Sequence, residues 1–306
     1  MSQIGLGWFF PNGAEDAAHR STFVDDCDRC LELVKGHFTS AWMADHLQFG
    51  KADILEGWTT LTYFAARHPE LQFGHAVLCQ SFRNPALLAK MAATFQFLSG
   101  GRLVFGLGTG WHEPEYQAYN YPFPGPGTRV EELEEVVTIC KRMWAEDEVT
   151  FEGKHYAVQG AVCEPRPDAP PPIVIGGAKP RMLRLIARHA DWWDVSGFGG
   201  VARARYPEIA AEMDRACSDV GRDPATLRRT FSCMCVCAET EEAVAELAKD
   251  MKPGFGLVGT PDQILEQVKP FHDLGVTHFQ LAFADFPATT SLELCIAEIL
   301  PRIAAL

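Results

Sequence analysis

Hydrophobic residues along this chain follow two patterns: short runs that are apolar throughout, and longer stretches with apolar residues every three or four positions. The short runs predict buried strands, and the longer stretches predict amphipathic helices. The expected strands are 4–9, 38–44, 71–79, 102–108, 173–175, 192–195, 229–237 and 277–283. The expected helices are 17–35, 57–67, 85–98, 179–189, 203–220, 241–252, 261–274 and 290–303. Strand and helix therefore alternate over most of the chain.

The alternation is interrupted after the fourth strand. Residues 111–127 are rich in Tyr, Pro and Gly and carry no period, which predicts a long functional loop. Thr128 and Glu131 have capping-box spacing and predict the start of a helix, whose acidic residues 131–135 we expect to face solvent. Segments 149–152 and 155–158 predict a small hairpin, and a Pro-rich linker, 164–172, leads back to the alternating pattern.

Eight strands that alternate with helices predict an α/β fold of the (β/α)₈ TIM-barrel type, with residues 1–306 as a single domain and an insertion at about 111–170. The nearest rival is a doubly wound sheet. Against that rival, the glycines at 106, 108 and 110 do not have G-x-G-x-x-G spacing, and no helix is expected directly after them.

Composition limits the classes of function. The 306 residues are 47% hydrophobic and carry a formal net charge of −13. Such a chain lacks the basic surface that binds nucleic acid or anionic lipid, and no apolar run approaches the roughly twenty residues that span a bilayer. The first residues lack the features of a signal peptide, so we expect a cytoplasmic protein. The ten cysteines are scattered, and we expect core residues such as Cys233, Cys235 and Cys237 rather than a metal site.

In a barrel the active site lies at the carboxyl ends of the strands, so residues just after each strand are the candidates. His46 follows the second strand, where a histidine can exchange a proton near neutral pH. Gly176 and Gly177 precede an expected helix start and, with Arg181, predict a phosphate site. The substrate-pocket candidates at other strand ends are Trp8, Trp111, His112 and Glu113.

The stretch 100–116 ends its strand in glycines, and backbone without Cβ atoms suits the close approach of a flat cofactor. Five motifs in this order resemble the bacterial luciferase-like superfamily. They are S-A-W-M-A-D-H at 40–46, S-F-R-N-P-A-L-L-A-K at 81–90, S-G-G-R at 99–102, G-L-G-T-G-W at 106–111 and I-V-I-G-G at 173–177.

The resemblance implies a barrel with an insertion, a homodimer, and either coenzyme F420 (a deazaflavin) or FMN as cofactor. It implies a cis peptide bond between Ala76 and Val77, and cofactor contacts from Asp45, these two residues, Thr109 and Gly110. The phosphate would meet Gly176 and Gly177. His46 matches the catalytic histidine of deazaflavin-dependent dehydrogenases in this group. Those similar to the glucose-6-phosphate enzyme carry a glutamate directly after G-T-G, where this chain has Trp111.

Three hypotheses follow for function. The first is an F420-dependent oxidoreductase that passes hydride between the deazaflavin and a small organic substrate, with His46 moving the proton. The alternative is an FMN-dependent monooxygenase that uses oxygen and reduced flavin supplied by a separate reductase. The third is a flavin-binding protein without catalytic activity. No motif distinguishes F420 from FMN as the cofactor, and the sequence of the pocket segments does not indicate the substrate.

Overall fold

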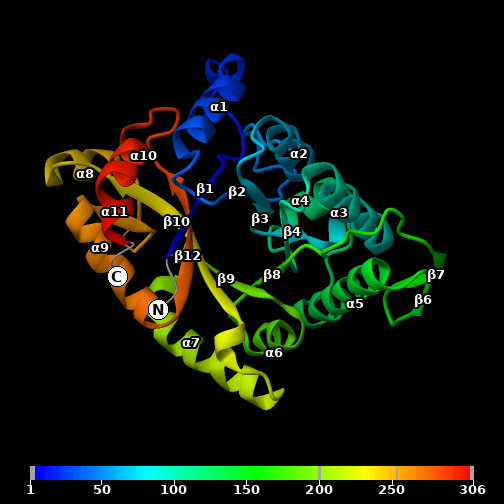
Figure 1. Ribbon diagram of the computed structural model, residues 1–306. Helices are drawn as coiled ribbons and strands as arrows, with labels where there is room; N and C mark the ends of the chain where they lie inside the picture. Colours follow the sequence, from blue (N-terminus) through cyan, green and yellow to red (C-terminus); the bar gives the residue numbers. More distant parts are fainter. Residues whose placement is uncertain (1–3, 199–200, 253, 304–306) are drawn as a thin grey trace.

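The computed structural model describes residues 4–198, 201–252 and 254–303, in which eight parallel strands form a ring (Figure 1). In ring order they are β1 (Gly5–Phe9), β2 (Ser40–Met43), β3 (Gln72–His75), β5 (Leu103–Gly108), β8 (Ile173–Gly176), β9 (Trp192–Ser196), β10 (Arg228–Cys237) and β12 (Val276–Phe283). β12 pairs with β1 and closes the ring. Two short strands, β4 (Leu78–Cys79) and β11 (Leu257–Gly259), extend the sheet beside β5 and β10.

Helices surround the strands, as Figure 1 shows. They are α1 (Phe23–Val34), α2 (Gly57–Arg67), α3 (Pro85–Ser99), α4 (Glu113–Ala118), α5 (Pro126–Ala145), α6 (Pro180–His189), α7 (Val201–Asp219), α8 (Glu241–Leu247), α9 (Pro261–Asp273), α10 (Thr290–Leu294) and α11 (Leu300–Ile303). A π-helical turn, Cys295–Ile299, joins α10 to α11. The predicted TIM barrel is confirmed, and the doubly wound alternative is wrong because the sheet closes on itself.

Local sequence explains where the helices begin. The Asn84 side chain accepts hydrogen bonds from the backbone N–H groups of Ala86 and Leu87, and Pro85 occupies the first turn of α3. Gly100, with φ of 66°, ends the same helix in a left-handed conformation that glycine adopts without steric cost. The residues that close α3 therefore lead directly into β5, which carries part of the site.

Strand alternation divides most apolar residues of the barrel between an inner and an outer core. Phe9, Trp42, Val104, Val174 and Trp192 form one cluster and fill the lower part of the barrel interior. A larger cluster, which includes the buried cysteines of β10, packs between the strands and the helices. Successive side chains of a strand face opposite sides, so the residues just above the inner cluster point into the barrel mouth.

The insertion differs from the sequence expectation in two respects. Residues 113–118 form α4 instead of continuing the expected loop, and α5 begins at Pro126 rather than after Thr128. The hairpin is confirmed as β6 (Val149–Glu152) and β7 (Ala157–Ala161), with β7 displaced along the chain from its expected range. α5 packs between α3 and α6 and so completes the outer ring of helices, whereas the hairpin projects from it (Figure 1).

The acidic residues at the start of α5 are half-exposed, but they also hold other segments of the protein. The Glu135 carboxylate accepts hydrogen bonds from the backbone N–H groups of Lys154, His155 and Tyr156, at 2.7, 3.0 and 2.9 Å. Glu131 pairs with Lys154 and His155 and also with Arg181 at the start of α6. These carboxylates therefore fasten the hairpin and α6 to α5.

Candidate active site

A cavity of about 300 Å³ opens at the carboxyl ends of the strands. Its lining comes from the segments that follow β2, β3 and β5 and from the ends of β8 and β9. The lining residues are Ala44, Asp45, His46, Ala76, Val77, Leu78, Cys79, Gly110, Trp111, Glu115, Gly176, Gly177, Ala178, Asp194, Val195 and Ser196. The structure thus brings together most of the residues that the sequence singled out, although they are far apart along the chain.

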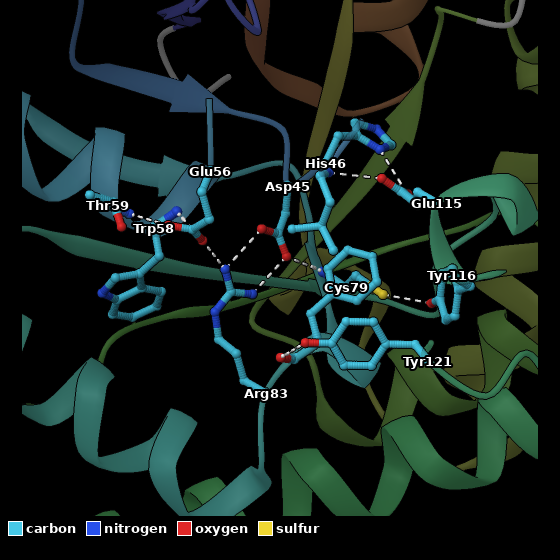
Figure 2. Close-up of polar contacts among 12 residues, drawn as sticks. Asp45, His46, Glu56, Trp58, Thr59, Cys79, Arg83, Glu115, Tyr116 and Tyr121 are labelled. Carbon is cyan, nitrogen blue, oxygen red and sulfur yellow. Dashed lines mark hydrogen bonds and ion pairs between the residues drawn. The ribbon is translucent and has the colours of Figure 1, made fainter. Parts of the chain in front are cut away.

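Asp45 is buried in this wall, and its carboxylate is fully engaged (Figure 2). Arg83 donates to both oxygens, at 2.7 and 2.9 Å, and the backbone N–H of Cys79 donates at 2.9 Å. Arg83 also pairs with Glu56, which caps α2. Burial alone would lower the pKa of Arg83, but its bonds to Asp45 outweigh that effect and raise the pKa. Asp45 therefore fixes the segment between β2 and α2 in place.

His46, the next residue, is held by a carboxylate that the sequence did not reveal. Its Nδ1 lies 3.1 Å from Oε1 of Glu115, whose other oxygen accepts from the backbone N–H of Leu47 at 2.9 Å. Glu115 is only 2% exposed because α4 buries it against this segment. Figure 2 shows the two side chains facing each other from β2's loop and from α4. A carboxylate at Nδ1 orients the imidazole and fixes its tautomer, as acid–base chemistry requires.

The peptide bond between Ala76 and Val77 is cis, as the resemblance implied. The glycines around it are required by packing against this bend. A Cβ on Gly106 would lie 1.7 Å from the carbonyl oxygen of His75, and one on Gly108 would lie 2.4 Å from Cγ2 of Val77. A Cβ on Gly110 would lie 1.9 Å from the hydroxyl oxygen of Tyr116. Glycine was expected here to let a cofactor approach closely. At 106 and 108 the structure gives a different reason, because a Cβ atom would clash with His75 or Val77.

Gly176 and Gly177 line the cavity, but the peptide groups of Gly177 are already bonded. Its N–H donates to the carbonyl of Asp194 at 3.1 Å, and its carbonyl accepts from Nε1 of Trp193 at 2.7 Å. Arg181 does not line the cavity, because it pairs with Glu131 at 2.7 Å. The side chain of Lys179 does not cap α6, so the first-turn N–H groups of that helix are the anion-binding donors nearest this glycine turn.

Aromatic rings form the mouth of the cavity. Trp111 is 67% exposed and lies edge-on to His46, with 5.7 Å between ring centroids. The ring of Phe49 packs on those of His46, Trp111 and His112, with ring centroids 4.4, 5.9 and 4.7 Å apart. His112 and Glu113 do not line the cavity: His112 packs beside this cluster, and Glu113 begins α4 in an exposed position. Phe49 was not among the residues expected at the site.

Two other expected site residues lie elsewhere. Trp8 does not line the pocket, because strand alternation turns it toward the helices, where it packs on Phe10 at 4.4 Å between centroids. Thr109 is not a lining residue either, and its carbonyl accepts from the Tyr116 hydroxyl at 3.4 Å.

Cys79 and Asp194 also line the cavity. Burial raises the pKa of the Cys79 thiol to about 12, so this group is neutral at ordinary pH and not a nucleophile. Its sulfur lies 2.6 Å from the Tyr116 hydroxyl (Figure 2). Asp194 was detectable in the sequence, because it is an acidic residue between the apolar residues Trp192, Trp193 and Val195 of one strand.

Residues 5–255 match the model of the family described as luciferase-like monooxygenase. The chain belongs to this family.

Proteins with similar sequences have more than one activity. An F420-dependent glucose-6-phosphate dehydrogenase from Kineococcus radiotolerans is 35% identical over 54% of this chain and half of its own length. One from Intrasporangium calvum is 26% identical over 99% of this chain and all of its own length. A pyrimidine monooxygenase, RutA, from Stutzerimonas stutzeri is 29% identical over 65% of this chain and 55% of its own. These relatives support a flavin- or deazaflavin-dependent oxidoreductase and leave the specific reaction open.

The same fold occurs in an F420-dependent secondary alcohol dehydrogenase solved with an F420–acetone adduct. The TM-score is 0.83 over 99% of both chains, at 17% sequence identity. At this identity the likeness concerns the fold alone. Across the described ranges, none of the helices has the length and apolar character needed to cross a membrane.

Proposed function

We propose that this protein is an F420-dependent oxidoreductase that transfers hydride between the deazaflavin and a small organic substrate. The observation that carries the proposal is the His46–Glu115 pair at the wall of the cavity, with Nδ1 and Oε1 3.1 Å apart. A hydride transfer to or from a carbonyl or alcohol needs an accompanying proton transfer, and an oriented histidine supplies it. The two F420-dependent relatives support the choice of cofactor.

The residues present fit a flat ring. Small residues line much of the cavity beside the Ala76–Val77 bend: Ala44, Gly110, Gly176, Gly177 and Ala178 leave room for a ring. The first turn of α6 supplies N–H donors for the phosphate. When bound, the deazaflavin supplies the two-electron redox chemistry. His46 holds or releases the proton, Glu115 keeps its ring in place, and Trp111 limits the access of water from the mouth.

The substrate that this cavity fits best is small and uncharged. Within the described part of the chain, no lysine or arginine side chain lines the cavity. Lysine and arginine side chains are the usual partners of the phosphate of a phosphorylated sugar. Trp111 also replaces the glutamate that resembling sugar-oxidising enzymes carry after G-T-G. We therefore propose a small alcohol or carbonyl compound rather than glucose 6-phosphate.

An FMN-dependent monooxygenase is the second candidate, favoured by the pyrimidine monooxygenase among the relatives. That reaction uses reduced flavin from a separate reductase and needs a dry cavity. The two candidates are separated by titrating the apoprotein with F420 and with FMN and recording visible spectra. Saturable binding of F420, with much weaker binding of FMN, is the expected result. Tight FMN binding without F420 binding would overturn the first proposal.

The role of His46 is tested by His46→Ala. We expect turnover with F420 to fall by roughly 10²- to 10⁴-fold, the usual contribution of a general acid–base group. Cofactor affinity should change little, because the neighbouring Asp45 keeps its own partners. His37→Ala is the control, since His37 is exposed and does not line the cavity. Undiminished turnover in a folded His46→Ala protein would remove the proton-transfer role.

We further propose a cytoplasmic homodimer. All ten cysteines are free and buried, which suits a reducing compartment. Phe97 and Leu98, at the end of α3, are 65% and 75% exposed and offer apolar surface to a second copy. Sedimentation of the wild type against Leu98→Glu tests the assembly: a dimer that the substitution dissociates is expected, and a monomeric wild type would overturn it.

A further inference from the structure

Asp194 is an acidic side chain on the floor of the cavity that the proposed acid–base pair does not use. On β9 its neighbour Trp193 faces outward and stacks on Tyr206 of α7, at 6.0 Å between ring centroids. Asp194 therefore faces into the barrel, one step above Trp192 of the inner core. The residue is only 3% exposed and lines the cavity together with Gly176 and Ser196.

The carboxyl group has hydroxyl partners rather than a cation. Thr230 Oγ1 donates to Oδ1 at 2.8 Å, and Ser232 Oγ donates to Oδ2 at 3.0 Å. Among the residues that the structure describes, no lysine, arginine or histidine forms an ion pair with Asp194. Burial raises the pKa of Asp194 to about 6, and the two hydroxyl bonds only partly oppose that effect. The carboxyl group is thus poised to change its protonation near neutral pH.

No other charged group competes for this proton. The charged or titratable groups on the elements around Asp194 include Arg228, Arg229 and Cys233 on β10, Arg203 and Tyr206 on α7, His278 on β12, and Asp45 and His46 after β2. Arg229 pairs with Asp214 on α7, and the Arg203 guanidinium donates to the carbonyl oxygen of Gly256. Arg228 stacks on Trp192 below Asp194, and His278 is a neutral ring bonded to Ser40. Asp45 is neutralised by Arg83. The pKa of Asp194 is accordingly governed by burial and not by these groups.

Filling the cavity removes the water that stabilises a carboxylate, so occupancy favours the protonated acid. A protonated carboxyl group has one O–H donor in addition to the acceptor positions that Thr230 and Ser232 use. Flavins and deazaflavins share ring carbonyl oxygens that accept hydrogen bonds. We propose that Asp194 binds the cofactor ring as the neutral acid and donates a hydrogen bond to a ring carbonyl, so that cofactor binding takes up a proton. This inference rests on the proposed function, because it requires such a ring in the cavity.

The test is the pH dependence of cofactor affinity between pH 5 and 8, measured with F420 and with FMN by ring fluorescence. Wild-type affinity should fall as pH rises above about 6, approaching tenfold per pH unit. Asp194→Asn keeps a donor but cannot titrate, so its affinity should lack this fall. The ratio of the two curves cancels the ligand's own titrations. Calorimetry at pH 7.5 in two buffers of different ionisation enthalpy should show uptake of about one proton in the wild type and none in the variant.

A second variant protects the test against loss of folding in Asp194→Asn. Ser232→Ala removes one hydroxyl bond that stabilises the carboxylate, so the fall in affinity should move to higher pH. Parallel curves for wild type and Asp194→Asn, or affinity that rises with pH in the wild type alone, would overturn the role of Asp194 and leave the proposed function intact. Failure of both cofactors to bind the wild type at any pH would overturn both.

Discussion

The carboxylate of Asp45 is buried beside the proposed catalytic histidine, and Arg83 balances its charge. The side chains are 0% and 10% exposed, so neither ion has water as an alternative partner. Removing one member of such a pair leaves an uncompensated charge in a poorly solvated site. The pair is therefore important for the local structure around His46.

Arg83→Leu should lower the free energy of unfolding by about 3–5 kcal/mol, the usual cost of breaking a buried ion pair. Urea denaturation at pH 7 measures the change. Lys269→Ala is the control: Lys269 and Asp273 are 60% and 53% exposed, so its loss should cost less than about 1 kcal/mol. Equal, small effects of both substitutions would show that water or a proton reaches Asp45 and neutralises it.

Gly108 and Val77 form a second residue-scale contact that can be tested. A Cβ on Gly108 would lie 2.4 Å from Cγ2 of Val77, so Gly108→Ala should destabilise the protein by about 1–3 kcal/mol through overpacking. Val77→Ala removes the clashing methyl group. The double variant should therefore be less destabilised than the sum of the two single variants, as a thermal or urea double-mutant cycle would reveal. Additive effects would mean that the two side chains do not compete for this space.

At the scale of elements, the hairpin β6–β7 depends on α5 more than on its own two strands. Glu135 accepts three consecutive backbone N–H groups at the turn. Glu135→Ala should leave these donors without their carboxylate and speed amide exchange at residues 154–156 by roughly tenfold or more, since each such bond contributes about 1 kcal/mol or more. Glu152→Ala, at an exposed position of β6, is the control and should leave the exchange unchanged. Unchanged exchange in both would show that the strands alone hold the turn.

The strands of the barrel were predictable because each is a short apolar run between helical patterns. α4 was not, because His112, Pro114 and Tyr119 resemble loop residues, and its buried face consists of Glu115 and Tyr116. A glutamate is rarely buried, so nothing marked Glu115 as the partner of His46. The contacts of the acidic run on α5 were not predictable for a similar reason: the sequence shows the charges but not the N–H groups that approach Glu135 from 154–156.

The site shows the same limit. Strand ends placed His46 and Gly176 at the cavity, because their positions follow from chain order in a barrel, and the family resemblance placed Val77 and Gly110 there. The Trp8 side chain was expected in the pocket but points away from it. Its direction follows from the alternation of side chains along β1, and a shift of one residue in the expected strand reverses that direction. The side-chain partners of Asp45, His46 and Asp194 come from elements 36 to 69 residues away and have no local signal.

Across the whole molecule, buried ionisable groups of opposite type set how stability depends on pH. Burial lowers the pKa of His75 to about 4 and that of His278 to about 3, so both rings stay neutral in the folded barrel. In the unfolded chain a histidine takes up its proton below about pH 6.5. The unfolded state then binds more protons, and stability rises with pH over this range. Asp194 acts in the opposite sense, because it keeps its proton to about pH 6 when folded and loses it near pH 4 when unfolded.

Between about pH 4.5 and 5.5 the two histidines together should raise the free energy of unfolding by about 2.7 kcal/mol per pH unit, and Asp194 should lower it by about 1.4. These three groups therefore contribute a net rise of about 1.3 kcal/mol per pH unit in the wild type. In Asp194→Asn the opposing contribution is gone, and the rise should be about twice as steep. Urea denaturation of both proteins at pH 4.5, 5.0 and 5.5 measures the two slopes. Parallel slopes would mean that Asp194 is ionised in the folded barrel, because only a proton held in the folded state and released on unfolding can offset the histidines.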